Sequence, residues 1–170
     1  MQTDTVIETT RLWLEKAVIG LNLCPFAKAV YVKNRVRMVV SSAPHLDGLL
    51  EDLDRELVYL AGADPSECET TLLIHPHLLA EFEDFNDFMQ LAEAAVAEHD
   101  LEGVIQVASF HPQFQFADTA PTDIGNYTNR APYPTLHLLR EASITKAIEG
   151  YPNTETIYQR NIAVLQEIGT

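Results

Sequence analysis

Short apolar runs alternate along the chain with longer segments in which large apolar residues recur at helical spacing. Residues 35–42 (RVRMVVSS), 70–75 (TTLLIH) and 103–110 (GVIQVASF) combine β-branched and apolar residues, which is typical of strands. Two helices are predicted between these runs by Leu46, Leu49, Leu50, Leu53, Leu57 and Leu60, and by Phe82, Phe85, Phe88, Met89, Ala92 and Val96. The predicted order is therefore β-α-β-α-β.

This alternation predicts an α/β fold with a mainly parallel sheet, because each helix is long enough to return the chain across the sheet by a right-handed crossover. The strand order stays open. Helical spacing also predicts an N-terminal helix from Val6 to about Leu21 and two C-terminal helices. The first is opened by Pro134 and contains Leu136, Leu139, Ala147 and Ile148, and the second runs from about Asn153 to Ile168. A chain of 170 residues fits one domain, spanning 1–170.

The charge of the chain excludes some classes of partner. The net charge is −14, and residues 47–102 carry 16 acidic residues against one base, Arg55. The basic residues Lys28, Lys33, Arg35 and Arg37 form only a small cluster, so we expect neither nucleic acid nor an anionic membrane as a partner. The chain holds two cysteines, its first residues are polar, and no apolar run reaches the roughly 20 residues that span a bilayer, so we expect a cytoplasmic protein.

The segment from Phe110 to Arg140 is the most informative about function. It is rich in proline and asparagine, and loops of this length inside a domain are often functional. Arg130 offers a planar guanidinium, and amide donors and a helix predicted to begin at Pro134 surround it, which favours an anion. The predicted ligand-binding residues are Asn126, Asn129, Arg130, His137 and Arg140, the last two on one face of that helix. The alternative is structural: the asparagines fix turns, and the arginines pair with Asp118, Asp123 or Glu141.

Histidines follow the predicted strands. His45, His75, His77 and His111 lie at or just beyond the carboxyl ends, which share one rim in a parallel sheet, and ligands of open α/β sheets bind beyond that rim. The alternative is that they only terminate strands. A metal site built on His75 and His77, with His111 or Asp118, is weakened by Pro76, and no HExxH, paired CxxC or EF-hand spacing occurs, so no metal is predicted.

Cys24 precedes Pro25, which can open a short helix and leave the thiol at its positive end beside Lys28. The tetrapeptide Cys-Pro-Phe-Ala resembles a turn of omega-class glutathione transferases, and Cys-Pro-Phe resembles one of glutaredoxins. The context differs, because a helix precedes Cys24 here and Ala27 stands where a resolving cysteine would lie. A buried, unreactive cysteine is the alternative.

Three segments together resemble a bacterial protein family called domain of unknown function 1415: GLNLCPFAKAV, SFHPQFQFADT and NYTNRAPYPTLHLLREAS. The resemblance covers essentially the whole chain. It implies one complete unit and brings no activity, cofactor or catalytic residue with it.

The residues therefore carry the functional hypothesis: an enzyme, a hydrolase or group transferase, acting on a small anionic metabolite. His111 is the predicted general acid or base and Cys24 the predicted nucleophile. The first alternative is a non-catalytic binding or adaptor protein for a small anion or a partner's carboxylate, and the second is a thiol-redox protein using Cys24. The sequence leaves the cofactor and the oligomeric state undetermined.

Overall fold

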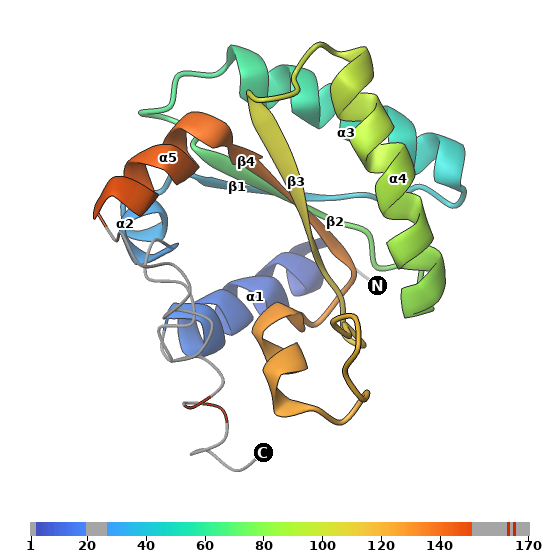
Figure 1. Cartoon of the computed structure of the whole chain (residues 1–170). Coiled ribbons are helices and arrows are strands. Elements are labelled where there is room, and N and C mark those ends of the chain that lie inside the picture. The colour runs from blue at the N-terminus through green and yellow to red at the C-terminus, as the bar shows by residue number, and fades with distance from the viewer. Residues whose placement is uncertain (1–2, 20–26, 151–162, 164, 166–170) are drawn as a thin grey trace.

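A four-stranded sheet forms the centre of the computed structural model, which describes residues 3–19, 27–150, 163 and 165. Its strands are β1 (Val36–Val40), β2 (Thr70–Ile74), β3 (Ile105–Phe110) and β4 (Thr135–Arg140). The order across the sheet is β1-β2-β4-β3 (Figure 1). β1 and β2 are parallel, whereas β4 runs antiparallel to both β2 and β3. The fold is therefore mixed α/β, and the prediction of a mainly parallel sheet was wrong.

The error has one source, the segment predicted to begin a helix at Pro134. Residues Thr135–Arg140 form β4, and the helix starts only afterwards, as α5 (Glu141–Gly150). β4 lies between β2 and β3, and its Leu136 and Leu138 are fully buried. A strand covered on both faces reads as a continuous apolar run, which spacing alone does not distinguish from a buried helix.

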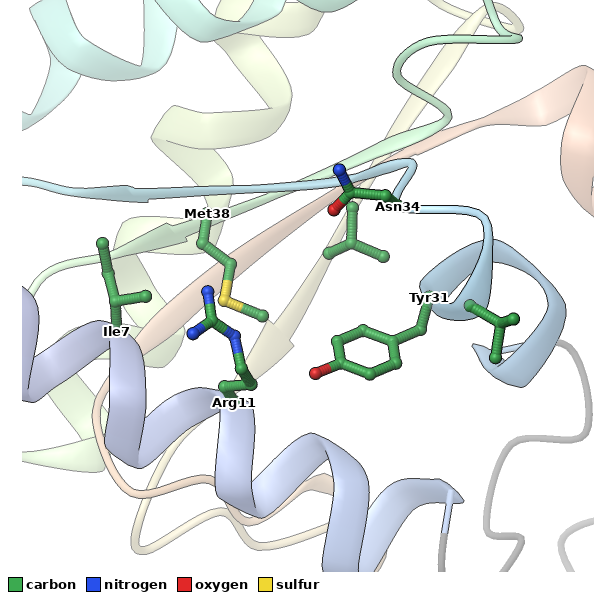
Figure 2. A pocket seen from close by; sticks show the side chains of 7 residues that line it. Ile7, Arg11, Tyr31, Asn34 and Met38 are labelled. Carbon is green, nitrogen blue, oxygen red and sulfur yellow. The ribbon is translucent and has the colours of Figure 1, made fainter.

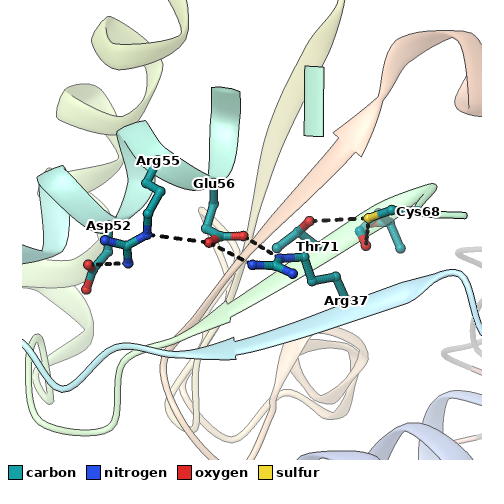
Figure 3. Close-up of polar contacts among 7 residues, drawn as sticks. Arg37, Asp52, Arg55, Glu56, Cys68 and Thr71 are labelled. Atoms are coloured by element: carbon teal, nitrogen blue, oxygen red, sulfur yellow. Dashed lines mark hydrogen bonds and ion pairs between the residues drawn. The ribbon is translucent and has the colours of Figure 1, made fainter. Parts of the chain in front are cut away.

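Two long helices cover one face of the sheet (Figure 1). They are α3 (Leu46–Gly62) and α4 (Phe82–Glu98), as the leucine and phenylalanine stripes predict. Their buried side chains form the main core together with Leu73, Ile105, Leu136 and Leu138 of the sheet. α3 is also tied to β1, because the Arg37 guanidinium donates to the carboxylate of the buried Glu56 at 2.8 Å (Figure 3). The same guanidinium stacks on the ring of Tyr59.

The N-terminal helix crosses the opposite face. α1 (Thr3–Trp13) continues into the π-helical segment η1 (Leu14–Ile19), so the predicted helix is present but widens after Trp13. Val6 packs against Leu72 and Ile74 of β2, and the Trp13 ring meets Phe110 of β3 edge to face. The short helix α2 (Ala27–Val32) leads into β1. Most of the helix predicted from Asn153 to Ile168 lies outside the described residues, but Ala163 and Leu165 are described and helical, and Leu165 is buried.

The helices of the described residues are too short or too polar to cross a bilayer.

Candidate binding cleft

The loop between β3 and β4 is held together by the residues predicted to bind an anion. It contains one 3-10 helix, η2 (Ile124–Asn129). The fully buried Asn126 accepts a hydrogen bond from the Phe116 N–H at 2.9 Å and donates to the Ala120 carbonyl at 2.9 Å. Asn129 donates to the Ser109 carbonyl at 3.1 Å. Both side-chain amides therefore cross-link the loop, as the structural alternative predicts.

Arg130 is used in the same way. Its Nε donates to the Phe114 carbonyl at 3.0 Å, one terminal nitrogen donates to the Pro121 carbonyl at 2.7 Å, and the guanidinium stacks on the Tyr127 ring. Within the part of the chain that the structure describes, Arg130 forms no ion pair, so the predicted pairing with Asp118 or Asp123 is wrong. The guanidinium joins two distant points of the loop instead.

His137 and Arg140 point to opposite faces of the sheet. The prediction that they share a helical face was wrong, because they lie in β4 and residues an odd number of positions apart in a strand face opposite sides. Arg140 donates to the carbonyls of Ala63 and Cys68 at 2.8 and 2.9 Å. It ties β4 to the turn before β2 and does not pair with Glu141 in the described structure.

His137 faces α1 and has a defined tautomer. The Thr70 hydroxyl lies 2.7 Å from His137 Nε2 and donates its one proton to the Leu138 carbonyl, also at 2.7 Å. Thr70 must then accept from His137 Nε2–H, which leaves Nδ1 as an unprotonated acceptor. Burial lowers the pKa of His137 from 6.5 to about 4. His137 is therefore a neutral ring on the sheet at neutral pH.

His75 and His111 lie at the same edge of the sheet, as predicted, because β2 and β3 run in the same direction on either side of β4. His111 is fully buried, its Nδ1 accepts from the Gln113 N–H at 3.0 Å, and its Nε2 lies 2.9 Å from the Leu79 carbonyl. Both ring nitrogens are thus engaged by the backbone. Burial lowers the pKa of this ring. In this geometry His111 supports a loop and has no free nitrogen for acid or base catalysis.

His75 is also buried, and its Nδ1 lies 3.2 Å from the Leu78 carbonyl, whereas its Nε2 has no partner in the described structure. Burial lowers the pKa of His75 to about 4. His77 is exposed. No group of three or more metal-binding side chains occurs among the described residues.

Of the two cysteines, Cys68 lies within the described residues. Cys24 and Pro25 lie outside the described residues, so the predicted nucleophile and the start of its helix at Pro25 stay predictions, whereas a short helix, α2, is present from Ala27. Cys68 is buried, with Sγ 3.6 Å from the Thr70 carbonyl. A buried thiol of this kind behaves as a small apolar side chain.

A cleft lies away from the predicted site, between α1, α2 and the start of β1. Its volume is about 500 Å³. Figure 2 shows Ile7 and Arg11 reaching from α1 toward Met38 of β1, with Tyr31 of α2 and Asn34 alongside. Val32 and Val36 complete the lining. Among these seven residues Arg11 alone is charged, and four of the others are aliphatic.

Two carboxylates bind residues that line the cleft, Glu15 of η1 and Glu8 of α1. Tyr31 donates its hydroxyl hydrogen bond to the carboxylate of Glu15, which holds α2 against η1. Burial, followed by this hydrogen bond, raises the pKa of Tyr31. Arg11 lies 3.1 Å from Glu8, and both side chains are about half exposed. A surface pair of this kind is weak, at about 0 to 1 kcal/mol, so the guanidinium is available to another anion.

Sequence reasoning missed Ile7, Arg11, Tyr31 and Asn34. The one signal was the spacing of Ile7 and Arg11, four residues apart and so on one side of α1. That spacing did not reveal a cleft, because the cleft forms only where α1 and α2 pack beside β1.

One comparison with known proteins identifies a family. The family model described as protein of unknown function DUF1415 matches residues 5–170. The chain belongs to this family. The match covers all the elements of the sheet and the residues of the cleft, and it confirms the resemblance seen in the sequence. No curated protein and no solved structure matches the chain.

Proposed function

We propose that the protein binds a small, partly apolar anion in the cleft between α1, α2 and β1. The observation that carries this proposal is the lining: one guanidinium, from Arg11, in a cleft whose other residues are neutral and mostly aliphatic. Ligand pockets commonly combine an apolar wall with a few polar groups that fix orientation. A carboxylate with a short apolar tail matches both parts of this lining.

The same ligand class was predicted for the 110–140 loop, but the hydrogen bonds there favour the new position. Asn126, Asn129, Arg130 and Arg140 each bind backbone groups of the protein itself. An anion at Arg130 would have to compete with those bonds, whereas at Arg11 the competitor among the described residues is one exposed carboxylate, that of Glu8.

Two further features support the cleft. η1 is a π-helix of six residues. Such segments are rare in proteins overall, and those that occur are often found at functional sites. Asn34 lines the cleft with a positive φ of 59°, a conformation that asparagine adopts more often than most other residues with a side chain. η1 is linked to the cleft through Glu15, which accepts the hydrogen bond of the lining residue Tyr31.

Among the hypotheses drawn from the sequence, this geometry favours the non-catalytic binding protein. An enzyme needs a reactive group beside the ligand, and the cleft lining contains no histidine, cysteine or carboxylate among the described residues. The hypothesis of a hydrolase or transferase using His111 and Cys24 is left as a prediction from the sequence.

The test uses the fluorescent sulfonate 8-anilinonaphthalene-1-sulfonate, which combines an anion with apolar rings. We expect saturable binding at one site per chain, displaced by octanoate but not by octanol or octylamine. Arg11→Gln should weaken octanoate binding about tenfold or more, because charge-assisted hydrogen bonds contribute about 1.5 to 3 kcal/mol.

Lys33→Gln is the matched control. It removes one positive charge next to Val32 and Asn34, at an exposed residue that does not line the cleft. Equal weakening by Arg11→Gln and Lys33→Gln would mean that the dye senses only overall charge. Displacement by octanol as well as by octanoate would contradict an anion site.

A further inference from the structure

β1 is an edge strand of the described sheet. In the order β1-β2-β4-β3 its one neighbour among the described residues is β2, and the side of β1 that faces away from β2 is called the free side. The Ser41 N–H donates to the Ile74 carbonyl at 2.7 Å, and the Arg35 carbonyl accepts from the Glu69 N–H at 2.9 Å. Because backbone groups of successive residues point to alternate sides of a strand, the odd-numbered residues of β1 bond to β2. The N–H and C=O groups of Val36, Met38 and Val40 point to the free side.

This free side borders the cleft. Val36 and Met38 line the cleft with their side chains and carry two of the three sets of outward backbone groups. In Figure 2 the Met38 side chain descends from β1 into the space above Arg11. An extended chain lying along β1 would therefore reach the cleft with its side chains on the α1 side.

We propose that β1 accepts the C-terminal segment of a partner protein as an added strand, with the last side chain in the cleft and the terminal carboxylate on Arg11. The proposal rests on the proposed function and specifies its ligand. Addition of a strand to a sheet edge is a recurring mode of peptide recognition, in which backbone hydrogen bonds supply affinity and pockets supply specificity.

The lining favours a chain terminus over an acidic side chain. A C-terminal residue bears its carboxylate on the same carbon as its side chain, so one apolar residue can meet both the aliphatic lining and Arg11. An aspartate or glutamate side chain offers the carboxylate without an apolar group. The expected last residue is therefore valine, leucine or isoleucine.

Charge disfavours a second copy of the chain as the occupant. Strand β1 of another copy brings no carboxylate to Arg11, because residues 17–46 contain no aspartate or glutamate. Association of two copies also brings together two chains of net charge −14.

The experiment uses the intact protein as bait to select peptides from a random heptapeptide library that is displayed on phage with free C-termini. The affinity of each enriched peptide is then measured for the synthetic acid and for the C-terminal amide. We expect enrichment of apolar last residues and at least a tenfold loss on amidation. Methylation of the peptide nitrogens one at a time should weaken binding at alternate positions only, because every second N–H faces β1.

Val40→Pro tests the strand itself. The N–H of Val40 points to the free side, so proline removes an outward donor without removing a bond to β2, as edge strands tolerate. Val40→Ala is the control, since it shortens the side chain and keeps the N–H. Val40→Pro should weaken the peptide at least fivefold relative to Val40→Ala and leave octanoate binding unchanged, because Val40 does not line the cleft.

The outcomes separate the two proposals. Octanoate binding with no enriched peptide, or with peptides whose methylation losses show no alternation, overturns strand addition and leaves the proposed function in place. Both proposals are supported if Arg11→Gln loses octanoate and peptide binding together, while Val40→Pro loses peptide binding alone. Concentration-dependent dimers that enriched peptides fail to dissociate would assign the edge to a second copy and overturn the proposal. If Val40→Pro does not fold, the methylation series decides alone.

Discussion

His75 and His111 hold two successive carbonyls of one loop. His75 Nδ1 lies 3.2 Å from the Leu78 carbonyl, and His111 Nε2 lies 2.9 Å from the Leu79 carbonyl. Leu79 has a positive φ of 62°, a strained conformation for a residue with a side chain. The two rings also flank Phe85 of α4, with centroids 5.5 and 5.1 Å away. The pair of histidines therefore fixes the connection from β2 to α4.

Acid should destabilise the protein well above the pKa of its carboxylates. The pKa values of His75 and His137 are about 4 in the folded protein and near 6.5 when unfolded, so the unfolded state binds more protons between these values. Their stabilising contribution is complete above pH 6.5 and is lost as the pH falls toward 4. Each histidine should cost at most about 2 kcal/mol between pH 7.5 and 5. This is an upper limit for His137, because part of this residue is accessible to solvent.

Urea unfolding at pH 7.5 and pH 5 measures this difference. His137→Asn should be less stable than the natural protein at pH 7.5 and should lose less free energy of unfolding between the two pH values. An unchanged difference would mean that His137 does not titrate between them.

Asn126 should be the most sensitive position of the loop between β3 and β4. Asn126→Ala removes the acceptor of the Phe116 N–H and the donor to the Ala120 carbonyl, both of them part-buried hydrogen bonds, which should cost about 1 to 3 kcal/mol. Urea unfolding measures the loss. Asn86→Ala, on the exposed side of α4, is the control and should change stability by about 0.5 kcal/mol or less. A similar small effect at Asn126 would contradict its role as a cross-link.

Arg130→Lys should destabilise the protein in the absence of any ligand, by about 1 kcal/mol. Lysine keeps the charge but has no planar group that can reach the carbonyls of Phe114 and Pro121 together. Faster proteolysis within residues 112–134 would locate the effect in the loop. The sequence also predicts that Arg130 binds a ligand, and octanoate affinity in Arg130→Lys and Arg35→Lys tests that prediction. An affinity loss specific to Arg130→Lys in a fully stable variant would return the anion site to this loop.

Glu56→Gln should destabilise the protein, because it breaks a charge pair whose carboxylate is buried (Figure 3). The carboxylate of Glu56 is buried, and the Arg37 guanidinium that binds it is more than one third exposed, so the expected loss is about 1 to 3 kcal/mol, below that of a fully buried pair. The hydrogen bond to Glu56 raises the pKa of Arg37. The arginine stays charged after the substitution as well, because a guanidinium keeps its proton near neutral pH without a carboxylate partner.

The double variant Arg37→Met and Glu56→Leu should recover part of the stability lost by either single change, because it leaves neither charge unpaired. Strictly additive losses in urea unfolding would show that the two side chains contribute independently.

Local sequence determined much of this fold. The leucine stripe of α3 and the phenylalanine stripe of α4 predicted those helices, and apolar β-branched runs predicted β1, β2 and β3, because these patterns follow directly from side-chain spacing on each element. The shared direction of β2 and β3 also followed, from the helix between them.

Only tertiary structure decided the state of residues 135–140, because this apolar run becomes a strand by hydrogen bonding to β2 and β3, which are distant in sequence. That choice separates His137 from Arg140. Tertiary packing also decided the site: the polar side chains of the 110–140 loop bind backbone groups that their own fold brings near, and Arg11 faces a cleft that exists only where α1 and α2 meet β1. Residue type shows what a side chain can bind, but which partner it meets depends on contacts between segments far apart in the chain.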